Sequence, residues 1–220
     1  MKDSGRKNSG YPLAGNSWYM EDTRSVNLLL ETDEAAEWID KGWNFYDPAC
    51  GWGTIPRALA DDGRIGRERI FGTDLVDRRE WSWPGMAWTL DFLTATDGDM
   101  LNLGIDPQRT VLITNPPFDK AIGTCRFIEK GLELGFRHMA IFTDNDLLFS
   151  QWRVSLWRKW PLSKICFLSE RPSCPPGEGL MSGTITRGGG SKDFIWVLFS
   201  VGVAPQSTVM WLGDEKKVRI

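Results

Sequence analysis

Two hydrophobic patterns alternate along the chain: short apolar or β-branched runs, and segments with apolar residues at helical spacing. Runs of the first kind are typical of buried strands, and segments of the second kind are typical of amphipathic helices. We predict strands at 44–47, 69–74, 88–90, 110–114, 138–143, 164–168 and 194–201, with a further edge strand at 209–212. We predict helices at 25–39, 54–60, 120–134 and 148–160, the first two capped by Ser25 and Thr54.

This alternation predicts the fold class. Strands that alternate with helices form parallel sheets, because each crossover helix returns the chain to the same end of the sheet. The strands at 164–168 and 194–201 are joined by a long connection with several glycines, residues 169–193, which we call the excursion. We predict that the two strands form an antiparallel C-terminal hairpin. The expected fold is therefore α/β: a Rossmann-like, seven-stranded, mainly parallel sheet with helices on both faces.

The N-terminal segment differs from the rest of the chain. Residues 1–17 carry glycine, serine, asparagine and charge without hydrophobic periodicity, which predicts a flexible N-terminal arm. The full length of 220 residues suits one domain. We expect residues 18–220 to form it.

The strand at 110–114 ends in a stiff corner formed by Asn115, Pro116, Pro117 and Phe118. Prolines donate no hydrogen bond to a sheet and restrict the residue before them, so the chain leaves the sheet in an extended turn. In open α/β sheets, ligands bind beyond the carboxyl ends of the strands. Such a corner, taken alone, is often only a strand-ending turn, but a second motif upstream favours a ligand site.

That second motif is the glycine bend from Asp47 to Gly53, between the first strand and the next helix. Gly51 and Gly53 let the backbone approach a ligand, and the helix N-terminus offers N–H groups to a carboxylate. Asp47 suits a ligand ammonium group, and Asp74, at the end of the following strand, suits ribose hydroxyls or a simple capping role. The bend matches neither Gly-x-Gly-x-x-Gly nor a P-loop, which disfavours NAD and ATP.

Composition and charge narrow the function further. A net charge of −3 disfavours a protein that coats nucleic acid through its overall field. The single histidine, His138, and the spacing of the cysteines argue against a zinc site or a histidine-dependent triad; the cysteines are Cys50, Cys125, Cys166 and Cys174. The sequence shows neither a long apolar span nor a secretory signal, so we expect a cytoplasmic protein without a membrane partner.

Four motifs, taken in chain order, resemble those of one enzyme family. Asp47 to Gly53, Asp74 with Leu75, Asp91 with Phe92, and Asn115 to Phe118 resemble the motifs of class I S-adenosylmethionine-dependent N6-adenine methyltransferases, above all the small phage and prophage DNA methyltransferases. The similarity extends from Trp18 to Phe199, most of the chain. It implies S-adenosyl-L-methionine as the cofactor, adenine N6 in DNA as the acceptor, and no metal.

The resemblance also implies the site residues. The implied cofactor-binding residues are Tyr19, Asp47, Pro48, Ala49, Cys50, Gly51, Gly53, Asp74, Leu75, Asp91, Phe92 and Asn115. The implied catalytic residues are Asn115, Pro116, Pro117 and Phe118. An aromatic amine is a poor nucleophile because its lone pair is delocalised. The Asn115 oxygen and the Pro116 carbonyl are expected to accept hydrogen bonds from the amine, and the Phe118 ring is expected to stack on the base.

The acceptor is less well defined by the sequence. Arg171, Arg187 and Lys192, on the excursion before the last long strand, are the candidate nucleic-acid contacts. The basic and tryptophan-rich helix at 148–160 is better explained as a solvated face over a core. Two alternatives stay open: methylation of an RNA amine or of a protein glutamine amide, and a non-catalytic DNA-binding module with the same fold. The oligomeric state is not predicted.

Overall fold

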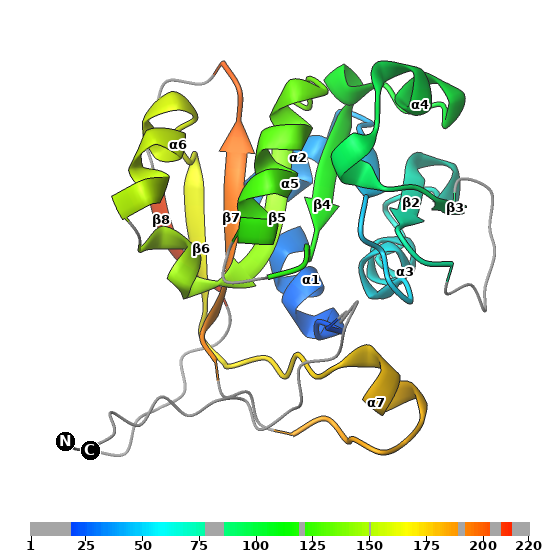
Figure 1. Cartoon of the computed structure of the whole chain (residues 1–220), viewed down its shortest axis with the longest axis vertical. Helices are drawn as coiled ribbons and strands as arrows, with labels where there is room; N and C mark the ends of the chain where they lie inside the picture. The colour runs from blue at the N-terminus through cyan, green and yellow to red at the C-terminus, as the bar shows by residue number, and fades with distance from the viewer. Residues whose placement is uncertain are drawn as a thin grey trace.

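The computed structural model describes residues 19–77, 86–118, 122–149, 151–188, 192–202 and 208–212. They form a sheet of eight strands in the order β3-β2-β1-β4-β5-β7-β6-β8, flanked by helices (Figure 1). The strands are β1 Asn44–Asp47, β2 Ile70–Asp74, β3 Met86–Thr89, β4 Thr110–Thr114, β5 His138–Asp144, β6 Lys164–Leu168, β7 Phe194–Ser200 and β8 Thr208–Leu212. The predicted arm at 1–17 lies outside the described residues.

The sheet is parallel except for one strand. β7 runs antiparallel to both of its neighbours, β5 and β6, whereas β8 adds to the edge parallel to β6. The predicted Rossmann-like fold with a C-terminal antiparallel hairpin is confirmed, and the predicted edge strand is the eighth. The strand order reverses between β1 and β4, which pair directly. Such a reversal opens a crevice at the carboxyl ends of the two strands.

The helices cover both faces of the sheet. One face carries α1 (Thr23–Leu30), α2 (Asp33–Asp40) and α3 (Thr54–Asp61); the other carries α4 (Asp97–Asn102), α5 (Ile122–Glu133) and α6 (Val154–Lys159). A short helix, α7 (Gly177–Met181), lies on the excursion between β6 and β7, beyond the carboxyl end of β4 (Figure 1). Single turns of 3-10 helix complete the connections at Arg67–Arg69, Phe92–Thr94, Pro107–Arg109, Asn145–Leu148 and Gln151–Arg153.

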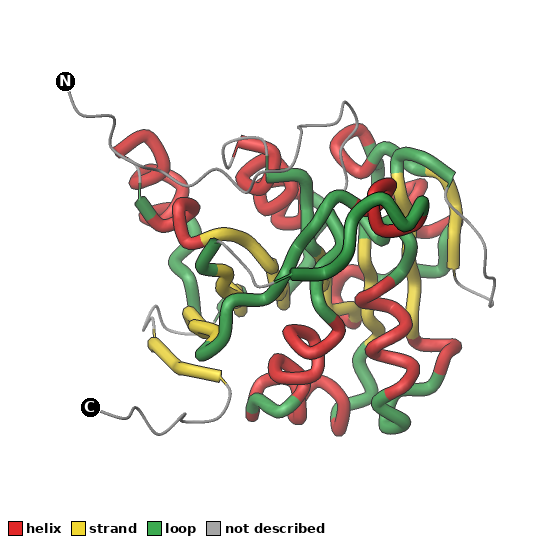
Figure 2. The backbone as a smooth tube through the Cα atoms, turned by 90° about the horizontal axis from the view of Figure 1, so that it is seen from below, coloured by secondary structure: helices red, strands yellow, loops and turns green. Residues whose placement is uncertain are grey.

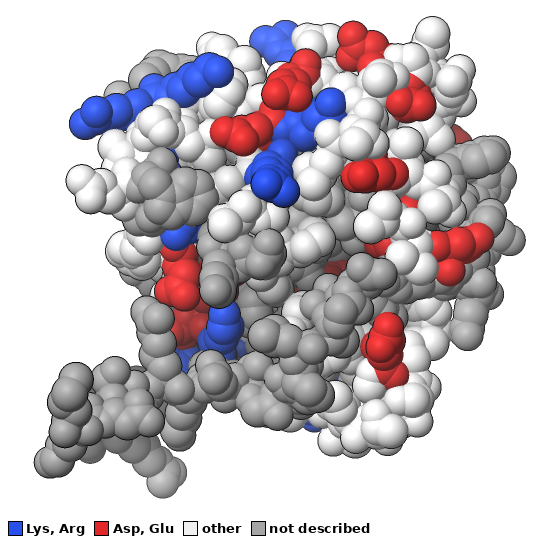
Figure 3. Space-filling view, viewed as in Figure 1, with Lys and Arg blue, Asp and Glu red and all other residues white. Residues whose placement is uncertain are grey.

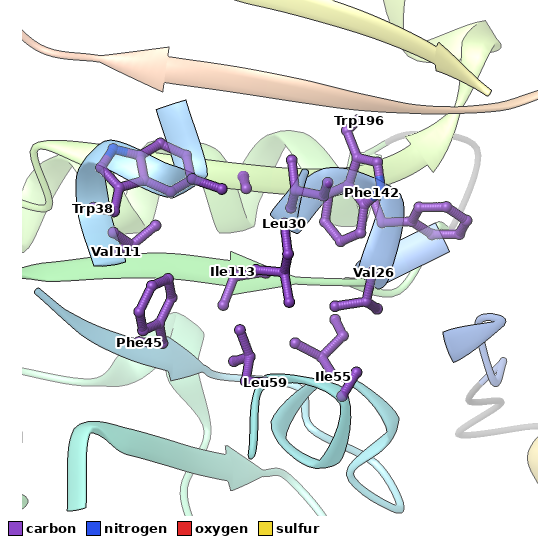
Figure 4. Packing of buried hydrophobic residues seen from close by; sticks show 14 of the residues in the cluster. Val26, Leu30, Trp38, Phe45, Ile55, Leu59, Val111, Ile113, Phe142 and Trp196 are labelled. Atoms are coloured by element: carbon purple, nitrogen blue, oxygen red, sulfur yellow. The ribbon is translucent and has the colours of Figure 1, made fainter. Parts of the chain in front are cut away.

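Alternation along the central strands builds two cores. On β4, Val111 and Ile113 face the α1–α3 layer, while Leu112 faces the α4–α6 layer. Figure 4 shows the first core, where Ile113 lies between Val26 of α1 and Leu59 of α3. Because both faces are covered, the strands read as continuous apolar runs rather than as alternating ones. Among the described residues, no helix has both the length and the apolar character needed to cross a bilayer.

The predicted helix at 25–39 is wrong in one respect, because two helices occupy this range. Asp22 caps α1, and Thr32 caps α2 by accepting a hydrogen bond from the Ala35 N–H (3.2 Å). Acidic residues in the first turn then favour a new helix start. Ser25, the predicted cap, is buried inside α1, where its carbonyl accepts from the Trp196 indole N–H (2.9 Å).

Two further helix predictions need correction. The N-cap of α3 is Gly53 rather than Thr54, and no side chain caps this helix. The continuous helix predicted at 148–160 is instead two 3-10 turns followed by α6. In that segment the Arg153 guanidinium donates to the Phe149 carbonyl (3.1 Å), which a continuous helix would pair with the Arg153 backbone N–H.

Candidate functional site

The sheet brings the two predicted turns together. β1 and β4 are parallel neighbours, with Tyr46 opposite Leu112 in register. Asp47 ends β1 and Thr114 ends β4, so the glycine bend and the Asn115 corner leave the sheet at the same edge. Figure 2 views the molecule from below, and loop segments cross the sheet at this edge.

The glycine bend adopts a conformation that favours glycine. Gly51 (φ 52°) and Gly53 (φ 80°) both lie in the left-handed region. The Cys50 N–H donates to the Thr73 carbonyl (2.9 Å), and the Gly51 N–H donates to Oδ2 of Asp74 (2.8 Å). The bend is therefore braced against the end of β2, and it places the N-terminus of α3, which no side chain caps, beyond the carboxyl end of β1.

Asp74 holds the bend in place. Its Oδ1 accepts from the Val76 N–H (3.0 Å), while its Oδ2 accepts from Gly51. These bonds stabilise the turn after β2 and cap none of the described helices, and ribose binding by the same carboxylate stays a prediction. Leu75, the next residue, is 59% exposed and is available to contact a ligand.

The Asn115 amide has a defined orientation. Its Nδ2 donates to the Tyr19 carbonyl (3.0 Å) and to Oε2 of Glu21 (2.7 Å), and it lies 3.8 Å from Sγ of Cys174. Its Oδ1 is buried, and none of the described residues donates a hydrogen bond to it. A buried acceptor without a donor is costly, which makes this oxygen a candidate ligand-binding atom.

The rest of the corner forms an aromatic wall. Pro116 is buried, Pro117 is exposed, and Phe118 is half-buried. The Phe118 ring lies 6.0 Å from the Tyr19 ring and 5.7 Å from the Phe194 ring. The ring is held by its neighbours and keeps surface for a planar ligand.

Two buried carboxyl groups, those of Glu21 and Asp47, accompany Oδ1 of Asn115 at this edge of the sheet. Glu21 is 6% exposed and Asp47 is 2% exposed. Burial raises the pKa of Glu21, and burial together with the Glu21 charge raises the pKa of Asp47 well above its usual value. The Asp47 carboxylate also accepts from the Ala49 N–H (3.1 Å). A buried acid whose pKa is raised in this way, as that of Asp47 is, suits a positively charged ligand, whose charge favours the ionised form.

Glu21 is the site residue that the sequence did not identify. Its segment, Tyr19 to Glu21, pairs with the excursion: Tyr19 forms an antiparallel bridge with Pro176, and the Met20 N–H donates to the Pro175 carbonyl (3.0 Å). We call residues 19–21 the strap. In the sequence, the only signal for Glu21 was its position just before the first helix. Its contact with Asn115 was not visible there, because the two residues are 94 positions apart.

Arg187 fastens the strap. Its guanidinium donates to the carbonyls of Met20 (3.2 Å), Glu21 (3.0 Å) and Ser173 (3.0 Å). The other two predicted nucleic-acid residues also make internal contacts: Arg171 pairs with Asp193 (2.6 Å), and Lys192 pairs with Asp144 (2.7 Å). Figure 3 shows basic and acidic side chains interspersed on the face of the molecule that carries α5. DNA contact by these three residues stays a prediction.

The Asp91–Phe92 motif lies partly inside the protein. The exposed Asp91 carboxylate accepts from the Leu93 N–H (3.0 Å) and so caps a 3-10 turn. Phe92 is only 2% exposed and packs against Tyr46 and Phe127, so its ring offers almost no surface to a cofactor. Cofactor binding by Asp91 stays a prediction. Within the described ranges, no group of three His, Cys, Asp or Glu side chains is placed to hold a metal ion.

Comparisons with known proteins find similarity in structure only. No protein-family model and no curated protein matches the sequence. The structure is similar to the methyltransferase subunit of a type I restriction-modification system from Streptococcus thermophilus (TM-score 0.53, 12% identity). It is also similar to DrdV in complex with DNA (0.52, 14%) and to the type ISP restriction-modification enzyme LlaGI bound to a DNA substrate mimic (0.52, 13%).

These similarities cover 89% of this chain but only 47%, 28% and 24% of the three larger chains, respectively. The chain thus corresponds to less than half of each of them. At such low identities the similarity shows a shared fold.

Proposed function

We propose that this chain is an S-adenosylmethionine-dependent methyltransferase that modifies adenine N6 in DNA. The observation that carries the proposal is the buried Oδ1 of Asn115, to which no described residue donates a hydrogen bond and which lies at the end of β4 beside the strand that leads into the glycine bend. An acceptor atom in this place suits an amine that needs its lone pair localised.

The described residues fit the cofactor. The N-terminus of α3, which no side chain caps, suits the cofactor carboxylate, and the buried carboxyl group of Asp47 suits its ammonium group. Asp74 and Leu75 lie at the end of β2, where ribose and adenine are expected. When bound, S-adenosylmethionine would supply a methyl group activated by a cationic sulfur. The neutral thioether would be its by-product, and the surplus proton of the methylated amine would pass to water.

The chain's own contribution is to bind and orient the amine. Oδ1 of Asn115 and the Pro116 carbonyl accept hydrogen bonds from the two N–H groups of the amine, which turns the nitrogen lone pair away from the base ring. Phe118, half-buried between Tyr19 and Phe194, stacks on the base and sets its plane. Catalysis then rests on positioning and electrostatics, without a covalent enzyme intermediate.

DNA is the proposed acceptor because the sequence motifs and the structural similarities favour it. Two of the similar structures contain DNA or a DNA mimic. An aromatic wall at the corner suits a nucleobase better than a glutamine side chain.

Labelled cofactor tests the proposal directly. The chain is incubated with methyl-labelled S-adenosylmethionine and, separately, with double-stranded DNA, single-stranded DNA, RNA and protein, and the products are digested and identified. We expect N6-methyladenine from DNA. Label in RNA or in a glutamine amide would overturn the choice of acceptor. Absence of cofactor binding by calorimetry would leave only a non-catalytic module.

A further inference from the structure

The orientation of the Asn115 amide depends on the strap. A side-chain amide can place either its oxygen or its nitrogen toward a ligand, and only one orientation serves an amine. Nδ2 of Asn115 faces two acceptors, the Tyr19 carbonyl and Oε2 of Glu21. A flipped amide would direct its oxygen at both, so the flip would exchange two hydrogen bonds for two repulsive contacts.

We propose that Glu21 is a positioning residue, which holds the Asn115 amide so that Oδ1 faces the acceptor amine. This inference rests on the proposed function. Glu21 acts through Asn115 and is not itself a catalytic residue. The hydrogen bond from Nδ2 of Asn115 to Glu21 (2.7 Å) is shorter than the one to the Tyr19 carbonyl (3.0 Å). A carboxylate is also a stronger acceptor than a carbonyl.

The surroundings of Glu21 fix its own place. The side chain is 6% exposed, and the Arg187 guanidinium holds its backbone carbonyl (3.0 Å) and that of Met20 (3.2 Å). Arg187 also holds Ser173, the residue before Cys174, whose Sγ lies 3.8 Å from the Asn115 amide nitrogen. The Glu21 side chain is enclosed by these neighbours and is therefore rigid. A residue that sets the orientation of another side chain has to be rigid.

Two substitutions separate positioning from other roles. Glu21→Gln keeps an oxygen that accepts from Nδ2 of Asn115, so we expect it to retain most of kcat. Glu21→Ala removes that acceptor, and we expect kcat to fall by about 10- to 100-fold. The affinity for S-adenosylmethionine, measured by calorimetry, is expected to change much less than kcat. Glu34→Gln is the matched control, because Glu34 is a partly buried acid paired with Lys164 at the amino end of β6.

The kinetic outcomes are distinct. Equal losses of kcat in Glu21→Gln and Glu21→Ala would mean that the charge matters rather than the hydrogen bond, and would overturn the proposal. Parallel falls in kcat, cofactor affinity and unfolding temperature in Glu21→Ala would indicate a merely structural role, and would also overturn it.

A second readout does not depend on activity. In protein labelled with 15N-asparagine, the Asn115 side-chain amide signal is identified by its loss in Asn115→Ala, and its hydrogen exchange rate is measured. We expect exchange at least about 10-fold faster in Glu21→Ala and unchanged in Glu34→Gln. An unchanged rate in Glu21→Ala would overturn the positioning role. Absence of methyl transfer by the wild type on every acceptor would instead overturn the proposed function, while the Glu21–Asn115 contact would still be confirmed by exchange.

Discussion

His138 and the Asn115 corner lie at opposite ends of the sheet and differ in how their polar atoms are satisfied. At the amino end of β5, Nδ1 of His138 bonds to Oγ of Ser200 (3.1 Å), and its ring packs 4.5 Å from that of Trp43. At the carboxyl end, two buried acids lie with an acceptor oxygen that no described residue satisfies. The contacts of His138 thus stabilise the fold, whereas the unsatisfied oxygen at the Asn115 corner lowers stability and is a candidate for ligand binding.

The sharpest test of this comparison is Asn115→Ala. We expect methyl transfer to fall by at least about 100-fold, because the substitution removes the acceptor that localises the amine lone pair. Cofactor affinity, measured by calorimetry, should stay within a few-fold of the wild type. Asn102→Ala, at the exposed end of α4, serves as the control. Equal loss of transfer and of cofactor binding would mean that the corner is structural only.

Asp74→Ala is expected to act on the cofactor instead. Without the hydrogen bond to the Gly51 N–H, the glycine bend loses its brace, and we expect cofactor affinity to fall about 10-fold or more. Asp106→Ala is a matched control, since Asp106 accepts from the N–H two residues on (2.9 Å) as Asp74 does, but at the amino end of β4. Unchanged affinity in Asp74→Ala would remove this acid from the cofactor site.

The buried acids predict a pH dependence of stability. Burial raises the pKa of Asp47 and of Glu21, so the folded protein keeps protons that the unfolded chain has already released. The free energy of unfolding should therefore fall as the pH rises above the ordinary carboxyl pKa of about 4. A pKa difference of one between the folded and unfolded states corresponds to about 1.4 kcal/mol.

Asp47→Asn tests this dependence by chemical denaturation at about pH 5 and about pH 8. We expect the variant to lose less stability than the wild type between these two values. An identical loss in both proteins would show that the Asp47 carboxyl is not the group that titrates.

The smallest effect on function is expected at the amino end. His138→Ala removes a hydrogen bond and the packing against two tryptophan rings, at a cost of about 1–3 kcal/mol in the free energy of unfolding. Methyl transfer at a temperature well below unfolding should be unchanged. A specific loss of kcat in this variant would break the division between the two ends.

The fold was predictable because its signals are local. Apolar runs such as Val111 to Ile113 identify strands buried on both faces, and the alternation with helices gives the parallel sheet. The division of the first helix was missed because the cap at Thr32 interrupts an apolar spacing that continues on both sides. The interruption after Leu148 was missed for a similar reason, since the Arg153 guanidinium takes a helical carbonyl only in the folded structure.

The site was predictable in part. The glycine bend and the Asn115 corner are short motifs with their own stereochemistry, and the strand order places them on neighbouring strands. The contact between Glu21 and Asn115 was not predictable, because it depends on the strap pairing with the excursion before β7. The buried position of Phe92 was missed for a related reason: a short motif does not show which of its side chains turns inward.

The three hydrogen bonds that Arg187 donates to the main chain have an evolutionary consequence. All three of its described hydrogen bonds go to main-chain oxygens, so Met20 and Ser173 can be replaced by many other residues without altering those bonds. An insertion or deletion of a single residue between Tyr19 and the start of α1 would shift two of these oxygens out of reach. Homologous chains are therefore expected to vary at Met20 and Ser173 while keeping Glu21 and the length of this stretch.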